Sequence, residues 1–420
     1  MPDEDPEPEL PLSREPHGRQ APHGLIAGAG IGGLAAALFL ARAGWRITIV
    51  DREPSLQEVG AGLQLAPNAT RLLKDIGIVD DLDDIAVEPT GLHIRLGRDG
   101  KTLSRTSLGR SGATRFGAPF LVVHRADLQN ALLRRVEQEP AIELHLGFRL
   151  VDIREREDGI AGLFVAADEK EARFEADLLI GADGLWSKAR SLAGLPAPTR
   201  YSGKTAWRTL IPRDEAPLFA REAEVNLWLG PDAHIVHYPV CGGHEINVVA
   251  IIEDDWREEG WSAPGNPDIV NSRFRNWNVK ARDLIAAAAS WNRWALIDRA
   301  PESRWSRTRM TLLGDAAHPM MPFLAQGASQ AIEDGAALAA LLAAPVPDGP
   351  ALSQALRRYD ALRIPRTARV QKEARRQGTI YHLDGAPAWM RDAAIRILPA
   401  DALLQRYDWL FSHDARNVSA

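Results

Sequence analysis

The stretch GLIAGAGIGGLAAALFLARAG, residues 24–44, decides the fold of this 420-residue chain. A short apolar run leads into a glycine-rich turn, and the alanine- and leucine-rich segment that follows predicts a buried helix closed by Gly44. The next segment, WRITIVDRE, is rich in β-branched residues, as expected of a buried parallel strand. Strand, helix and strand together predict a βαβ unit.

The glycines of this unit have the spacing of a dinucleotide site. We expect Gly28 to make the turn, Gly30 to let the backbone approach a pyrophosphate, and Gly33 to let helix and strand pack closely. Asp51 ends the second strand, where a carboxylate can accept hydrogen bonds from a ribose. The pattern suits NAD and FAD equally, and a tightly packed turn without a ligand is the alternative.

Composition excludes several classes of protein. The net charge is −6 and the basic residues are dispersed, which argues against a nucleic-acid partner. The single cysteine, Cys241, rules out a disulfide framework and a cysteine metal cluster, so we expect no metal site and a reducing, cytoplasmic location. Residues 1–23 are rich in proline and acid, which predicts a disordered tail rather than a signal peptide, and no segment reads as a membrane span.

The sequence predicts that the chain leaves the first domain and returns to it. The region 201–299 contains most of the tryptophans and strand-like segments at 206–211, 224–229, 234–240 and 245–252, which predicts an antiparallel sheet with an aromatic interior. MTLLGDAAH then returns to a buried strand, and the remainder is mainly helical. In the earlier segment APNATRLLKDIG, Asn68 is expected to cap a short helix.

Two further motifs follow the glycine motif: LLIGADGLWSKAR at 178–190 and GDAAHPMMPFLAQGASQAIED at 314–334. With these three motifs in order, the chain from residue 24 onward resembles the flavin-dependent aromatic hydroxylases related to p-hydroxybenzoate hydroxylase, and among them salicylate hydroxylase, 3-hydroxybenzoate 6-hydroxylase and 6-hydroxynicotinate 3-monooxygenase. The resemblance selects FAD as the dinucleotide.

The resemblance implies an α/β fold with a Rossmann-like FAD-binding domain of the glutathione reductase type, an inserted antiparallel-sheet substrate domain and C-terminal helices. The expected boundaries are 24–90, 113–197 and 298–345 for the FAD-binding domain, 91–112 and 198–297 for the substrate domain, and 346–420 for the helical region. A homodimer is possible within this family.

The resemblance also implies further FAD contacts. They are Arg52, Gln64, Arg125, Asp183, Asp315, and the backbone N–H groups of Gly327, Ala328 and Ser329 at the start of a helix. Local roles compete with some of these: Asp315 could cap a helix, Asp183 could be a turn residue, and Gln64 could lie in a surface turn. Arg125 could form a surface salt bridge instead. Asp51 stands where the family usually has glutamate.

The activity implied by the resemblance is hydroxylation of a phenol-like ring of the hydroxybenzoate, salicylate or hydroxynicotinate type. NADH or NADPH reduces FAD, dioxygen adds to give a C4a-hydroperoxyflavin, and the ring attacks its distal oxygen. Two other readings stay open: a tailoring hydroxylase or epoxidase of a larger apolar metabolite, and a flavin reductase or dehydrogenase without oxygen chemistry.

Activating the ring requires a base with a pKa near neutrality, which points to histidine. In HIVHYPV, residues 234–240, strand alternation places His234 and Tyr238 on one face and His237 on the other. By resemblance, His234 is the base, Tyr238 orients the substrate, and the Pro322 carbonyl lies near the reacting flavin carbon. A merely hydrogen-bonded sheet histidine is the alternative for His234. His318 follows the third motif and is expected to be structural. Arg208 resembles a residue of a strand at the substrate pocket, where it could pair with a substrate carboxylate or face solvent.

Overall fold

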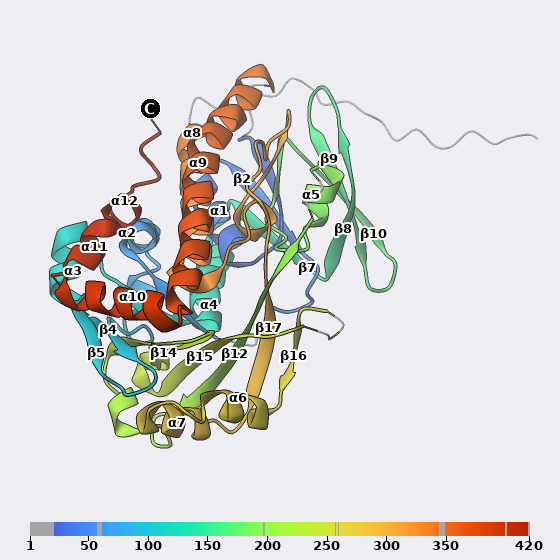
Figure 1. Cartoon of the computed structure of the whole chain (residues 1–420). Helices are drawn as coiled ribbons and strands as arrows, with labels where there is room; N and C mark the ends of the chain where they lie inside the picture. Colours follow the sequence, from blue (N-terminus) through green and yellow to red (C-terminus); the bar gives the residue numbers. More distant parts are fainter. Residues whose placement is uncertain are drawn as a thin grey trace, which may run out of the picture.

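A five-stranded, entirely parallel sheet carries the predicted dinucleotide site (Figure 1). The strands, in spatial order, are β18 (Met310–Leu312), β11 (Leu178–Gly181), β1 (His23–Ala27), β2 (Arg46–Asp51) and β7 (Ile142–Leu146). The sheet therefore joins segments from both ends of the chain, as the predicted departure and return require.

The computed structural model describes residues 21–56, 61–195, 198–256, 258, 260–343, 349–399 and 401–418. Most of the predicted disordered tail, residues 1–20, lies outside the described residues. The expected boundary of that tail needs one correction, because His23 already pairs with Arg46 in the parallel sheet.

Three helices pack together against the parallel sheet: α1 (Ile31–Arg42), α4 (Arg125–Gln138) and α8 (Gly327–Leu341). Helix α1 is buried along most of its length, which explains its alanine- and leucine-rich sequence. A Cβ at Gly335 would lie 2.8 Å from the Ala36 Cα, so the absence of a side chain there lets α8 approach α1 closely.

Smaller elements complete this half of the molecule. They are α2 (Pro67–Asp75), α5 (Lys188–Leu192), the antiparallel pair β3 (Gly62–Leu65) and β6 (Leu121–His124), and the antiparallel sheet β8 (Phe148–Glu155), β9 (Ile160–Ala166) and β10 (Glu171–Ala176).

An eight-stranded sheet forms the other half (Figure 1). Its strands, in spatial order, are β16 (Ser262–Gly265), β17 (Trp291–Asp298), β12 (Arg200–Pro212), β15 (Glu245–Glu253), β14 (Ala233–Val240), β13 (Glu224–Gly230), β4 (Gly91–Leu96) and β5 (Thr102–Ser107). The two segments expected for the substrate domain supply all eight strands. One correction concerns strand direction: β13 and β4 pair in parallel, because β4 enters from the earlier segment and joins the edge of the later one.

The far face of this sheet has the predicted aromatic interior. Helices α6 (Pro267–Phe274) and α7 (Val279–Ala286) cover it, and Trp207, Trp228 and Trp291 are buried in the core beneath them. The opposite face is turned toward the parallel-sheet half.

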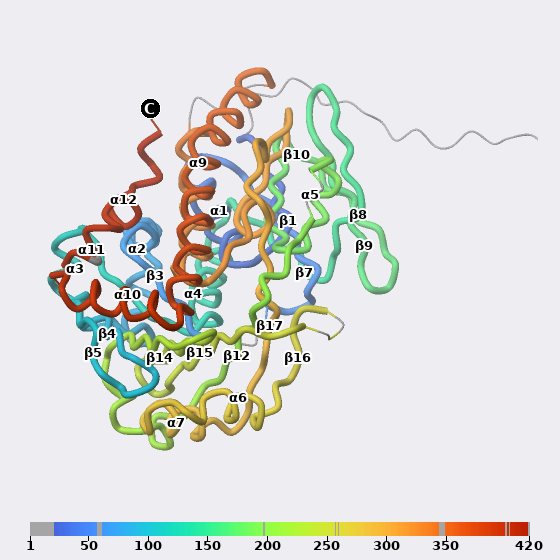
Figure 2. The backbone as a smooth tube through the Cα atoms, viewed as in Figure 1, coloured from blue at the N-terminus to red at the C-terminus, as the bar shows by residue number. Residues whose placement is uncertain are grey.

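The C-terminal region is helical, as predicted. Helices α9 (Gly349–Tyr381), α10 (Gly385–Ile397), α11 (Ala402–Arg406) and α12 (Asp408–Phe411) follow one another. Figure 2 shows α9 running beside the parallel-sheet half down to the eight-stranded sheet, where the chain turns into α10. Among the described residues, no helix combines the length and apolar character needed to cross a membrane. A short helix, α3 (Gly109–Phe116), lies near α11 and α12 (Figure 1).

Candidate active site

The glycine turn between β1 and α1 has the shape that its sequence predicts. Gly28 has a φ of 115°, which favours glycine, and a Cβ at Gly33 would overlap the Gly28 carbonyl oxygen. A Cβ at Gly30, by contrast, would meet no atom within 4 Å. The turn is therefore tight at its first and third glycines and open at the second, beside the N–H groups that begin α1. This shape suits a pyrophosphate.

Asp51 lies beside this turn at the end of β2. Its carboxylate accepts hydrogen bonds from the N–H groups of Ala29 at 2.6 Å and Glu53 at 2.9 Å. Each carboxylate oxygen has a second lone pair, so a ribose hydroxyl can still donate to it. Arg52 is exposed and its Nε pairs with Glu53 at 3.1 Å, so its contact with FAD stays a prediction.

The loop before α8 includes a tight turn, η5 (Pro322–Leu324). The Pro322 carbonyl accepts a hydrogen bond from the Ala325 N–H at 2.9 Å, and Ala325 has a left-handed φ of 52°. The turn thus fixes the direction of the Pro322 carbonyl, whose proximity to the flavin remains a prediction.

The N-terminus of α8 is the second helix end available to a cofactor. Gly327, Ala328 and Ser329 form its first turn, where backbone N–H groups have no acceptor within the helix. A Cβ at Gly327 would meet no atom within 4 Å. The predicted donors therefore lie at an open, electropositive helix end that favours negative charge on a bound group.

The Asp183 carboxylate is used locally. It accepts hydrogen bonds from the backbone N–H groups of Lys188 at 2.7 Å and Ala189 at 2.9 Å, and from the Ser187 hydroxyl. Burial raises the pKa of Asp183, against the effect of these donors. The carboxylate thus orders the start of α5, which agrees with the turn role considered above, and its predicted FAD contact remains untested.

Arg190 connects the second and third sequence motifs. Its buried guanidinium donates to the carbonyls of Ala316 at 3.1 Å and Ala317 at 3.3 Å. Asp315, in the same loop, is exposed, and the short helical turn there begins after Leu313 without a side-chain cap. The capping role considered for Asp315 is therefore wrong, and its carboxylate is accessible to a ligand.

Gln64 and Arg125 lie on the β3–β6 ribbon, between the two halves of the molecule. Arg125 opens α4 directly after β6, and its N–H donates to the Ala61 carbonyl at 3.0 Å. Gln64 is half-buried within strand β3, and its side chain lies near that of Tyr238 of the eight-stranded sheet. Gln64 is therefore not a surface turn residue.

His234 and Tyr238 lie on one face of β14, as alternation predicts. The His234 ring packs near Phe323 of η5, with ring centroids 5.6 Å apart, and near Tyr381 of α9, at 5.1 Å. This face is thus turned toward the loop before α8 and the end of α9. His237 points the other way.

The surroundings of His237 confirm its structural role. Its ring lies 5.8 Å from Phe219 and 6.4 Å from Trp228 between centroids, and neither ring nitrogen has a hydrogen-bond partner in the described part of the chain. Burial lowers the pKa of His237 to about 3. The ring is a neutral member of the aromatic core.

His234 and Tyr238 have altered proton affinities. Burial lowers the pKa of His234 well below its usual value, and His382 and Lys204 lower it further. His234 is therefore neutral near pH 7, with a ring lone pair available, but its pKa is lower than the near-neutral value expected of the base. Burial raises the pKa of Tyr238, so its hydroxyl stays protonated. His234 also contacts a further histidine, because its Nδ1 lies 2.8 Å from the Nε2 of His382.

Arg208 of β12 belongs to the same face. Register pairs Arg208 with Val249 of β15, and Val249 with Val236, which lies between His234 and Tyr238 on β14. We call Arg208, His234 and Tyr238 the polar sheet face.

The Arg208 guanidinium has no acidic partner in the described ranges. It lies 5.3 Å from the Trp294 ring centroid, and its Nε is buried without a hydrogen-bond acceptor. Burial lowers its pKa, and the Tyr238 side chain faces it. Arg208 is therefore half-buried rather than fully exposed, and an anion beside it would pair with a cation that has no acidic partner among the described residues.

Asn247 and Gly62, which the sequence did not single out, join this face to the β3–β6 ribbon. The Gly62 N–H donates to the Asn247 Oδ1 at 2.7 Å, and Asn247 pairs with Tyr238 across β15 and β14. A Cβ at Gly62 would lie 2.6 Å from the Tyr238 ring. A glycine in an otherwise ordinary strand is the only sequence signal for this close approach.

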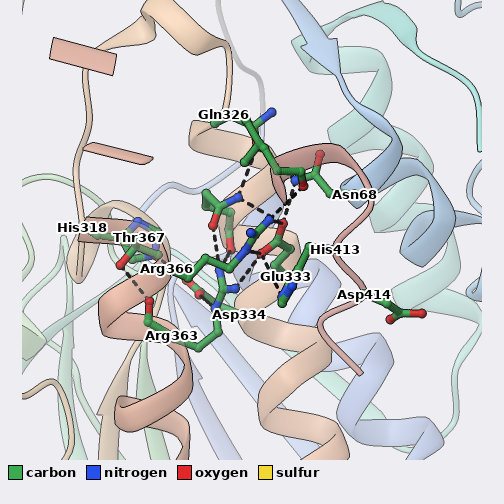
Figure 3. Close-up of polar contacts among 12 residues, drawn as sticks. Asn68, His318, Gln326, Glu333, Asp334, Arg363, Arg366, Thr367, His413 and Asp414 are labelled. Carbon is green, nitrogen blue, oxygen red and sulfur yellow. Dashed lines mark hydrogen bonds and ion pairs between the residues drawn. The ribbon is translucent and has the colours of Figure 1, made fainter. Parts of the chain in front are cut away.

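A second polar group, also missed, lies beneath the loop before α8 (Figure 3). Arg363 of α9 donates to Asp334 at 2.7 Å and to Glu333 at 2.6 Å, and Arg366 reaches both oxygens of Glu333 at 2.6 Å. Burial alone would raise the pKa of Glu333, but the two arginines outweigh burial and lower it to about 2.

Polar side chains from other elements complete this group. His318 binds Asp334 at 2.6 Å, which agrees with its expected structural role. Asn68 donates to Glu333 at 2.6 Å and to Gln326 at 3.0 Å. The predicted capping by Asn68 is wrong, because α2 begins at Pro67 and the buried amide serves the carboxylate instead. We call the group the buried ion network; it comprises Asn68, His318, Gln326, Gln330, Glu333, Asp334, Arg363 and Arg366.

Comparison with known proteins agrees with this geometry. The family model described as FAD binding domain matches residues 23–374. A 3-amino-4-hydroxybenzoate 2-monooxygenase from Streptomyces platensis is 39% identical over 94% of this chain and 97% of its own length. A 3-hydroxybenzoate 6-hydroxylase from Aquipseudomonas alcaligenes is 36% identical, over 93% and 97%. A salicylate hydroxylase solved as a substrate complex has a TM-score of 0.79 at 26% identity, covering 95% of this chain and 98% of that one.

Proposed function

The chain belongs to the FAD-binding family of flavin-dependent aromatic hydroxylases, and from this premise we propose that it hydroxylates a phenol that also carries a carboxylate. Two of the similar enzymes are named for hydroxybenzoates, which combine these groups. The polar sheet face offers one residue for each group. The observation that carries the proposal is the half-buried Arg208 side chain, whose Nε is buried without an acceptor and which has no acidic partner among the described residues, on the same face as a neutral histidine.

The residues that would hold FAD are those of the two open helix ends. The turn at Gly30 suits the pyrophosphate, Asp51 the ribose, and the start of α8 the negative charge of the reduced ring. When bound and reduced by NADH or NADPH, FAD activates dioxygen and supplies the oxygen atom for the ring.

The remaining steps belong to side chains of this chain. Arg208 binds the carboxylate and fixes the orientation of the ring. His234 accepts the phenol proton at Nε2, which makes the ring electron-rich, and Tyr238 hydrogen-bonds the substrate oxygen. The close packing of Phe323 and Tyr381 around His234 keeps water from the base.

The test is stopped-flow reduction of the FAD-loaded protein by NADH and NADPH, with hydroxybenzoates, aminohydroxybenzoates and hydroxynicotinates, and with the same rings lacking the carboxylate. We expect carboxylated phenols to accelerate reduction and to yield a product one oxygen heavier. In His234→Ala, FAD should stay bound while hydroxylation slows about 100-fold.

Each alternative predicts a different outcome. Flavin turnover without oxygen transfer would identify a reductase, and acceleration only by larger apolar compounds would identify a tailoring enzyme. If no aromatic compound speeds reduction, the proposal fails. Unchanged hydroxylation in His234→Ala would refute the assignment of the base.

A further inference from the structure

The predicted base is one of two histidines in direct contact. The His234 Nδ1 lies 2.8 Å from the His382 Nε2, although 148 positions separate the two in the chain. One nitrogen of such a pair donates and the other accepts. If Nδ1 of His234 carries the hydrogen, its Nε2 is free to accept a substrate proton, and His382 keeps its own hydrogen on Nδ1.

The outer nitrogen of His382 lies beside a partly exposed carboxylate. Its Nδ1 is buried without a hydrogen bond and lies 3.6 Å from Glu253 Oε1, at the end of β15. The side chain of His382 is 3% exposed, whereas that of Glu253 is 46% exposed and pairs with Lys204. The three side chains thus lead from the polar sheet face to solvent.

Backbone contacts hold this arrangement in place. His382 follows the last residue of α9, and its carbonyl accepts from the Asp232 N–H at 3.3 Å. The Asp232 carbonyl in turn accepts from the Glu253 N–H at 3.0 Å. The turn before His234 therefore fixes the positions of both His382 and Glu253.

We propose that His382 and Glu253 carry the phenol proton from His234 to solvent. This inference rests on the proposed function. The phenol O–H bond breaks as the His234 Nε2–H bond forms, and the His234 Nδ1 proton moves to the His382 Nε2. The His382 Nδ1 proton then passes to Glu253 and from there to water. The substrate is left as phenolate, both imidazoles are again neutral, and one proton has entered the solvent.

Electrostatics explains why such a route is needed. Burial, then Lys204, lowers the pKa of His382 to about 4, so neither histidine can store a proton near neutral pH. Glu253 is ionised there, because Lys204 lowers its pKa. The charged and titratable groups around His382 are Lys204 on β12, Glu253 on β15, Arg273 on α6, His234 on β14 and the neighbouring Tyr381 on α9.

The experiment follows proton release when a phenol identified by the substrate panel binds to the FAD-loaded protein. A pH indicator dye in stopped flow reports the released proton, and ultraviolet absorbance reports the bound phenolate. In His382→Gln, the amide oxygen can still accept from the His234 Nδ1 but the side chain cannot pass a proton on. We expect release to slow at least about tenfold, with phenol affinity nearly unchanged. Glu253→Gln should also slow proton release.

Two matched substitutions serve as controls. His244→Gln and Glu222→Gln change an exposed histidine just before β15 and an exposed glutamate just before β13, and both variants should release protons at the wild-type rate. Wild-type release in His382→Gln would overturn the relay and leave His382 a positioning residue. Should His382→Gln fail to fold, wild-type release in Glu253→Gln overturns it. Absence of release from the wild-type protein with every phenol would overturn the proposed function as well.

Discussion

The buried ion network and the polar sheet face differ in whether their charged side chains have partners of opposite charge within the chain. In the network, each carboxylate of Glu333 and Asp334 meets at least one cation within 2.7 Å. On the sheet face, the Arg208 Nε has no acceptor within the described residues. The charges of the network are paired within the chain, although the Asn68 Oδ1 and the His318 Nδ1 have no partner among the described residues, whereas the Arg208 cation has no acidic partner there.

The difference follows from the cost of burying charge. An unpaired buried charge is expensive, so a protein retains one only where a ligand compensates it. The network instead joins α2, α8 and α9 to the loop before α8, and thereby holds that loop in place (Figure 3). The paired charges thus hold the loop before α8, and the unpaired Arg208 cation is the one that we propose binds the substrate carboxylate.

The largest effect should come from breaking the network. Arg363→Met removes the cation shared by Glu333 and Asp334 and leaves two buried carboxylates short of a partner. Loss of one partner of a buried ion pair costs about 3–5 kcal/mol, so we expect a fall of that size in the free energy of unfolding. Urea unfolding monitored by circular dichroism measures it.

The matched control is Arg357→Met, an exposed arginine of the same helix, which should change stability by less than about 0.5 kcal/mol. Equal stability of the Arg363 and Arg357 variants would show that the network is dispensable.

A smaller effect on stability is expected at His237. Its ring nitrogens have no hydrogen-bond partner among the described residues, and it lies on the face of the sheet that packs on the aromatic core. Its pKa is about 3 in the folded chain and about 6.5 when unfolded, so below pH 6.5 only the unfolded chain gains the proton. Stability is therefore lost as pH falls from about 6.5 toward 3, at about 1.4 kcal/mol per pH unit.

His237→Leu should remove this loss. The free energy of unfolding should be measured for both proteins at pH 7 and at pH 5. From pH 7 to pH 5, the wild type should lose about 2 kcal/mol more than the variant. Parallel pH profiles of the two proteins would mean that His237 is protonated in the folded chain, contrary to its structural role.

Local patterns in the sequence predicted much of this architecture. Glycine spacing predicted the open turn at Gly30, and strand alternation separated His234 from His237, because both depend on neighbours in the chain. The contacts of Arg363 with Glu333 and of His382 with His234 depend on how distant elements pack, which no local pattern contains.

Some predictions failed or stay open for physical reasons. The cap role of Asn68 was wrong because a buried carboxylate offered the amide a better partner than the helix end did. The FAD contacts of Arg52 and Pro322, the homodimer and the cytoplasmic location stay predictions, because they concern molecules and surroundings outside this chain.

The smallest change in stability should come from Arg208, and this is the sharpest test of the comparison. Arg208→Met keeps most of the apolar stem beside Trp294 while removing a half-buried cation that has no acidic partner among the described residues. The lost cation–π contact, about 0.5–1 kcal/mol, is offset by relief of the desolvation cost, so unfolding should shift by less than about 1 kcal/mol.

Arg208→Met should impair binding of the substrate although it leaves stability nearly unchanged. The KM for carboxylated phenols should rise about 30-fold, as expected for a lost charged hydrogen bond of about 2 kcal/mol, while phenols without a carboxylate are affected little. Steady-state kinetics on matched ring pairs measures this. A destabilisation as large as that of Arg363→Met, with unchanged preference for the carboxylate, would mean that Arg208 is paired in the folded chain, and the distinction between the two polar groups would collapse.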